Sequence, residues 1–140
     1  MRVGLIGGVE AQLVGVTVDN FVHVLLTTAP GVERDRLDAE HADAFGRWAA
    51  TARETREDAP EQPGTRLMQV RVTVTDDVGG DYDFATGQAG GSGSEWQAMQ
   101  SFRPRPPVGV RELRLTLRSP EEPDGLSMVV PVDTADLSSD

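Results

Sequence analysis

Short runs of alternating apolar and polar residues, separated by turn-forming residues, restrict the fold of this chain more than any other feature. In the clearest run, 67–75, Val70, Val72 and Val74 share one face and polar residues occupy the other. A period of two is typical of a strand with one buried face. Comparable runs occupy 11–18, 21–28, 95–102, 110–117 and 126–132, and a return strand starts at 82–85. The pattern therefore predicts mainly antiparallel strands.

One segment follows a helical period instead. Within 36–57, Leu37, His41, Phe45 and Trp48 recur at steps of three and four residues, which is the spacing of one helix face. Two prolines shortly afterwards are typical of a helix end. We expect this helix to dock on the strands through Phe45 and Trp48.

Seven or eight strands and one helix predict an all-β fold, an immunoglobulin-like β-sandwich with an α-helix inserted at about 36–57. The 140 residues fit one domain. We assign it to 1–132, followed by an acidic, frayed tail at 133–140. The predicted core consists of Val16, Val22, Val24, Leu26, Val70, Val72, Val74, Trp96, Phe102, Leu113, Leu115, Leu117 and Val130.

The composition removes several classes of chemistry. Cysteine and lysine are absent, and all 13 basic residues are arginine. The chain therefore has no disulfide, thiolate metal site, Schiff-base lysine or P-loop lysine. A zinc site would need mostly carboxylate ligands, because His23 and His41 are the only histidines. We predict no cofactor, with calcium as the alternative considered below.

The net charge of −10 disfavours nucleic acid and anionic membranes as partners. The acidity is concentrated in 33–61 and 119–140, which carry net charges of −4 and −6. No apolar run is long enough to cross a membrane, and Glu10 interrupts the signal-like start of the chain. We expect a cytoplasmic protein with no nucleic-acid partner and no membrane insertion.

Four acidic residues, Asp76, Asp77, Asp81 and Asp83, crowd one predicted hairpin turn. Calcium prefers several carboxylate and carbonyl oxygens, which such a turn can supply. The spacing does not match an EF-hand, and aspartate and glycine are also ordinary turn residues. The four residues are thus candidate calcium ligands, with turn formation as the favoured explanation.

Other candidate chemistry is less defined. The glycines at 4–8 have the wrong spacing for a dinucleotide-binding motif, and those of the predicted glycine-rich loop 87–94 lack the lysine of a P-loop. His23 or His41 with a carboxylate would suit an enzyme, but a Ser–His–Asp arrangement is defined by geometry and not by spacing. No catalytic residue is assigned from the sequence.

The glycine-rich run 90–94 with Trp96, followed by the Pro-x-Pro-Pro connector at 104–107 and a leucine-alternating strand, resembles uncharacterised actinobacterial immunoglobulin-like proteins. The hairpin 75–82 is similar to hairpins of bacterial immunoglobulin-like domains. The resemblance covers about 67–118 and implies a β-sandwich, but no activity and no catalytic residue.

These observations favour a non-catalytic protein-interaction or scaffolding module with an unknown protein partner. Calcium or small-ligand binding at the hairpin 76–83 is the first alternative. An enzyme that uses carboxylates with His23 or His41 is the second. Exposed strand edges can pair between copies of the chain, so a homo-oligomer is a further alternative.

Overall fold

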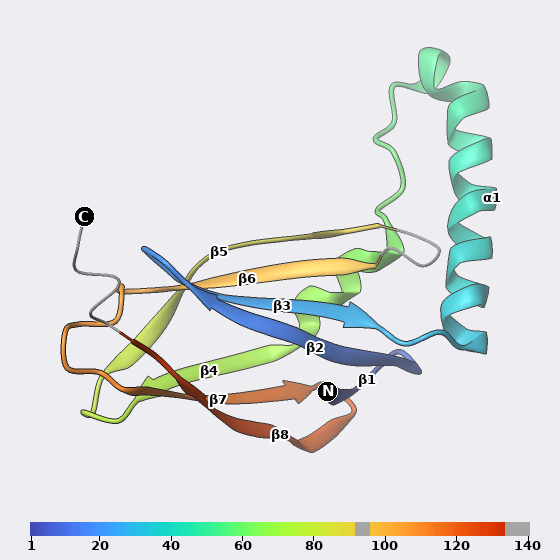
Figure 1. The fold of residues 1–140 in the computed structure, drawn as a ribbon. Coiled ribbons are helices and arrows are strands. Elements are labelled where there is room, and N and C mark those ends of the chain that lie inside the picture. Colours follow the sequence, from blue (N-terminus) through green and yellow to red (C-terminus); the bar gives the residue numbers. More distant parts are fainter. Residues whose placement is uncertain (92–95, 134–140) are drawn as a thin grey trace.

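A computed structural model describes residues 1–91 and 96–133, which form eight strands, one α-helix and one 3₁₀ helix (Figure 1). The predicted class, all-β and mainly antiparallel with one inserted helix, is confirmed, and the helix follows the third strand. In chain order the elements are β1 (Arg2–Ile6), β2 (Val9–Val18), β3 (Val22–Thr28), α1 (Val32–Thr55), η1 (Pro63–Gln69), β4 (Arg71–Asp76), β5 (Asp81–Gly90), β6 (Gln97–Arg103), β7 (Glu112–Ser119) and β8 (Glu122–Pro131).

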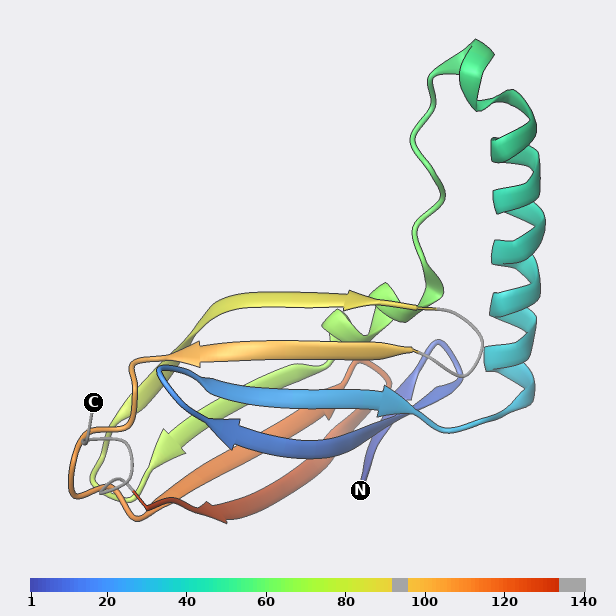
Figure 2. The same ribbon diagram turned by 45° about the horizontal axis from the view of Figure 1, so that its top comes forward.

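The strands belong to one sheet with the order β1-β2-β3-β6-β5-β4-β7-β8, and all neighbours are antiparallel. The pairs β3–β6 and β4–β7 unite strands that are distant in the sequence. Figures 1 and 2 show the sheet folded over itself, so that β2, β3, β6 and β5 face β4, β7 and β8. The two layers of the fold are therefore parts of one continuous sheet.

Two contacts hold the two layers of this folded sheet together, one where the sheet turns and one between its two outermost strands. β4 pairs with β5 only where Val74 lies opposite Tyr82 and Thr75 opposite Asp81. Between the outermost strands, the Arg2 guanidinium of β1 donates to both carboxylate oxygens of Glu122 on β8. The strands of one layer thereby stay above those of the other and enclose the core.

The core lies between the layers and contains most of the predicted residues. Only Val16, Val72 and Val130 of the predicted set are half-buried rather than buried. The first strand is not among the predicted strands, although its residues Val3 and Ile6 are almost fully buried. Glycines interrupt the alternation of apolar and polar residues there, so the local pattern does not indicate a strand.

The helix differs from its prediction in extent and in docking. α1 starts at Val32, directly after the N-cap residue Gly31, and ends where Arg56 adopts a left-handed conformation with φ 54°. The helix therefore begins before the predicted start near 36, and Gly31 holds the N-cap position with no side-chain cap bond that could mark this start in the sequence.

The prediction that Phe45 and Trp48 dock the helix on the strands is wrong. α1 is anchored near its base, where Leu37 is buried and the Trp96 indole donates to Asp38 at 2.8 Å. Figure 1 shows the rest of α1 projecting away from the strands. Phe45 is 46% exposed, and the Trp48 indole donates to the Glu57 carbonyl of the returning chain. Beyond its base, the apolar face of α1 thus packs on residues 56–62, the return segment that leads from α1 to η1.

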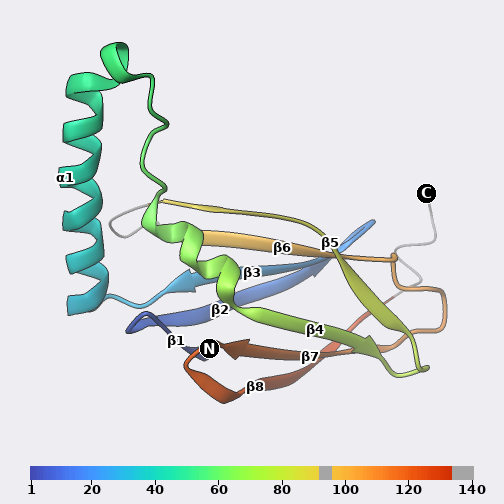
Figure 3. The ribbon, with the colours of Figure 1, turned by 180° about the vertical axis from the view of Figure 1, so that it is seen from behind.

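Residues 67–69 also depart from the predicted strand, because they belong to η1. Pro63 starts this helix, a position that suits proline. Within the helix, the Leu67 side chain is fully buried. Seen from behind, η1 lies between β5 and β4, where the two strands diverge (Figure 3). η1 therefore covers the core where β4 and β5 do not pair.

The glycine-rich segment is strand, not loop, as far as Gly90, because η1 packs closely against β5. The Gly64 amide donates to the Gly91 carbonyl at 3.0 Å, and a Cβ at Gly87 would meet Met68. The predicted loop residues 92–94, the first residue of the predicted strand 95–102 and residues 134–140 of the predicted tail lie outside the described residues.

We predict that Gly64→Ala lowers the free energy of unfolding by more than about 1 kcal/mol, because the added Cβ would overlap the Gly90 carbonyl oxygen. Gly46→Ala in α1 is the matched control, since nothing lies within 4 Å of its Cβ and alanine favours a helix. Urea unfolding measures both variants. Equal stability of Gly64→Ala and wild type would contradict the close packing.

Candidate functional site

Asp19, His23 and Ser101 form a chain of side-chain contacts that the sequence did not reveal. The His23 ring lies 2.7 Å from the Ser101 hydroxyl through Nδ1 and 2.8 Å from the Asp19 carboxylate through Nε2. Ser101 is directly opposite His23 in the β3–β6 register. The three residue types are those of a hydrolase triad, so their accessibility decides what they can do.

The accessible end of this chain is the carboxylate and not the hydroxyl. Ser101 is 1% exposed, whereas 67% of the Asp19 side chain is exposed. A nucleophilic serine must present its oxygen to the substrate, and this one is covered within the sheet. The Phe21 amide, followed by the His23 ring, lowers the pKa of Asp19. The arrangement fastens the β2–β3 turn to β6.

His41 lies far from His23. His41 projects from α1 beside a hollow of about 670 Å³ between the helix and the return segment, lined also by Leu37, Pro60 and Arg66. Its ring packs on Phe45 with centroids 6.0 Å apart, whereas His23 lies at the end of β3 farthest from α1 (Figure 1). The two histidines therefore do not form one site.

Asp76 is buried and organises the β4–β5 turn. Its carboxylate accepts from the amides of Val78 and Gly80 and from the Tyr82 hydroxyl at 2.7–2.9 Å. Burial alone raises the pKa of a carboxyl group, but these three donors outweigh burial and hold the pKa of Asp76 below its ordinary value. Burial and the bond to Asp76 also raise the pKa of Tyr82.

The other three candidate calcium ligands point elsewhere. Asp77 accepts from the Arg111 amide at 3.1 Å, and Asp81 and Asp83 are exposed on β5. No group of three or more acidic or histidine side chains in residues 1–91 and 96–133 is arranged to hold a metal ion. The contacts of Asp76 and Asp77 are those of turn residues, the explanation that the sequence favoured.

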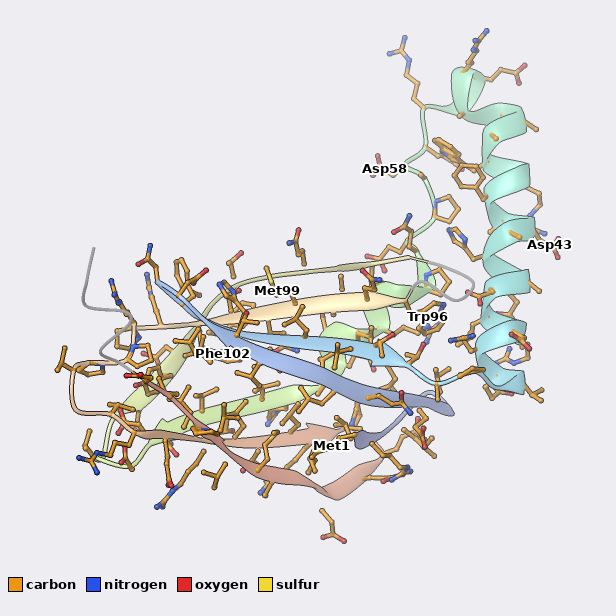
Figure 4. All side chains as sticks on the ribbon, viewed as in Figure 1. Met1, Asp43, Asp58, Trp96, Met99 and Phe102 are labelled. Carbon is orange, nitrogen blue, oxygen red and sulfur yellow. The ribbon has the colours of Figure 1, made fainter. Side chains whose placement is uncertain are left out.

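The outward surface of β2, β3, β6 and β5, which we call the outer face, carries no carboxylate or guanidinium group across its centre. The strand registers place Leu25, Met99 and Gln88 in one row across it. Figure 4 shows Met99 on the side of β6 that faces away from β4 and β7. Other outward residues of this central region are Gln12, Thr17, His23, Thr27, Thr86 and Gln97, and Ser101 has the same orientation but is covered.

A hollow of about 690 Å³ lies on the outer face and is lined by Val14, Leu25, Gln88 and Met99 among others. The opposite layer has a different surface, because Arg71, Arg114 and Arg118 point outward from it. Interface centres are poor in charged residues and rich in apolar ones such as methionine. The outer face therefore has the composition of a binding surface.

Comparison with family models, with curated proteins and with solved structures finds no match to this chain. The predicted resemblance to actinobacterial immunoglobulin-like proteins thus stays a prediction. No helix in the described part of the chain is both long enough and apolar enough to span a membrane.

We predict that millimolar calcium leaves the melting temperature unchanged. The carboxylate of Asp76 is occupied by its three donors, and a ligand that binds only the folded state must stabilise it. Thermal melts with calcium and with chelator measure this. A rise with calcium that chelator reverses would assign Asp76, Asp77, Asp81 and Asp83 as ligands.

We also predict that stability falls as the pH drops below about 4. The folded pKa of Asp76 lies below the unfolded value of 3.8, so the unfolded state takes up the proton first and gains stability from it. Asp76→Asn is expected to be less stable at neutral pH and to lose part of this acid dependence. Asp81→Asn, at an exposed site in the same hairpin, is the control in urea unfolding at pH 3–7. Parallel curves for all three proteins would contradict the role of Asp76.

Proposed function

We propose that this chain is a non-catalytic protein-binding module that contacts its partner through the outer face. The observation that carries the proposal is a partly apolar four-strand surface whose central rows carry no carboxylate or guanidinium group, on a chain with a net charge of −10. Exposed apolar patches rimmed by polar residues are typical of interaction sites. The partner surface is expected to be uncharged and partly apolar as well.

The geometry favours this role over the two alternatives. An enzyme that uses a carboxylate with a histidine would need an available ring nitrogen, but both ring nitrogens of His23 are held by Ser101 and Asp19. A serine nucleophile would need an accessible hydroxyl, but Ser101 is covered. A calcium site would need gathered carboxylates, but the candidate residues bind backbone amides or point to solvent. The predicted likeness to immunoglobulin-like proteins belongs to the same proposal, since it implies a sandwich without an activity. The predicted cytoplasmic location is also part of it.

Capture from a cell extract tests this proposal. Met99→Arg places a charge at the centre of the outer face, where a bound partner would bury it. This variant is expected to abolish capture of partners that the wild type retains. Thr73→Arg is the matched control, because Thr73 points outward from the arginine-rich layer. Thermal melts establish that both variants fold. If Met99→Arg retains the same partners as wild type, the outer face is not the binding surface.

A further inference from the structure

One flank of the folded sheet is not closed by strand pairing within residues 1–91 and 96–133. β2 pairs with the first strand only as far as Leu13, which leaves its edge free over Val14–Val18. β8 is the last strand of the sheet, so no strand pairs with its second edge, and β1 contacts it only near Glu122. Figures 1 and 2 show β2 and β8 bordering the same side of the molecule. We call these two free edges, with Leu126–Pro131 on β8, the seam.

The core is less completely covered along the seam than elsewhere. On β3, which is the next strand inward from β2, Val22 and Val24 are 0% exposed, and on β7 Leu113 and Leu117 are equally buried. The corresponding inward residues beside the seam are only half-buried, although they pack against the same core. They are Val16 and Val18 of β2, and Leu126, Met128 and Val130 of β8.

The edges of the seam carry little of the usual protection against pairing. Natural edge strands carry charged residues, prolines or β-bulges that prevent another strand from adding, and the free edge of β2 has a bulge only at its start, between Leu13 and Gly15. Residues 12–18 and 125–132 contain no charged residue, and Pro131 stands only at the far end of β8. Val14 and Val129, on these edge strands, are 65% and 53% exposed. The seam is thus suited to accept another strand.

β1 shows what kind of segment covers this flank. It runs antiparallel to β2, and Met1 exchanges two backbone hydrogen bonds with Leu13, one from its amino group and one to its carbonyl. Its inward residues Val3 and Ile6 are 2% and 1% exposed. The half-buried residues of β2 begin where the pairing with β1 stops. An antiparallel strand with alternating apolar residues therefore closes one part of the flank, and the same kind of strand fits the rest.

We propose that the seam binds an extended, uncharged peptide segment of a partner protein, which adds to β2 as an antiparallel strand in line with β1. The free edges correspond to a strand of about five to seven residues, which is an ordinary strand length. Alternate apolar side chains of that segment would cover Val16, Val18 and Met128. Main-chain hydrogen bonds to the β2 edge would supply affinity, as in other cases of strand addition. This site adjoins the outer face, with which it shares Val14, and its remaining residues lie outside that face.

The charge of the chain favours a foreign segment over a second copy. Two copies would bring together two molecules that each carry −10, and like charges oppose association. An uncharged peptide meets no such repulsion at the seam. A second copy is therefore an outcome that the experiment must separate from the proposal.

The probe is a synthetic peptide of about seven residues that alternates valine and threonine and has blocked ends. We expect saturable binding in calorimetry and a higher melting temperature. The same peptide with alternate N-methylated residues is the control, because it cannot donate the main-chain bonds, and it is expected to bind at least about ten-fold more weakly. Val16→Lys should abolish binding, and Val108→Lys, at an exposed loop site, should not.

A second test does not depend on whether Val16→Lys folds. An alternating valine and threonine extension placed before Met1 is expected to raise the melting temperature, whereas an extension shifted by one residue places valine outward and should not. The proposal is overturned if both peptides bind equally, if neither binds, or if wild type forms a dimer that Val16→Lys dissolves. Met99→Arg must leave peptide binding unchanged, which separates this site from the proposed function of the outer face.

Discussion

The short pairing between β4 and β5 is the joint on which the rest of the structure depends. Because only Val74–Tyr82 and Thr75–Asp81 pair, the sheet can turn there and fold its two halves together. Asp76 fixes the geometry of the turn, because its carboxylate accepts hydrogen bonds from two backbone amides of the turn and from the Tyr82 hydroxyl. The apolar rows of β3 and β7 can then meet in one core, and η1 covers the opening that the divergence of the strands leaves.

The sequence predicted the parts of the fold that depend on local periodicity. Val74 in β4, or Leu113 and Leu117 in β7, alternate with polar residues because one face of each strand is buried, and that relation is local. The stripe of Phe45 and Trp48 is equally local, but the chain after the helix determines what it packs against. A period identifies an apolar face and does not identify its neighbour, so the docking prediction was wrong.

The candidate site depends on contacts that no local pattern contains. His23 and Ser101 are 78 residues apart and meet only because β3 pairs with β6, which is not its neighbour in sequence. The acidic hairpin was recognised, yet its sequence could not show that Asp76 is buried while Asp81 and Asp83 are exposed. The uncharged outer face likewise combines residues of β2, β3, β6 and β5, and it becomes visible only with the strand order.

The anchoring of α1 at its base has a consequence for motion. Between Ala42 and Glu54 no described side chain is buried, so that part of the helix adds little to the shared core. Its backbone can open without breaking the strand pairs, and such segments exchange their amide hydrogens through local unfolding. The chain therefore has two levels of protection, a cooperative β body and a helical arm whose order is set by its own turns and its return segment. A protease that cuts the arm would leave the strand pairs and the β-core contacts in place.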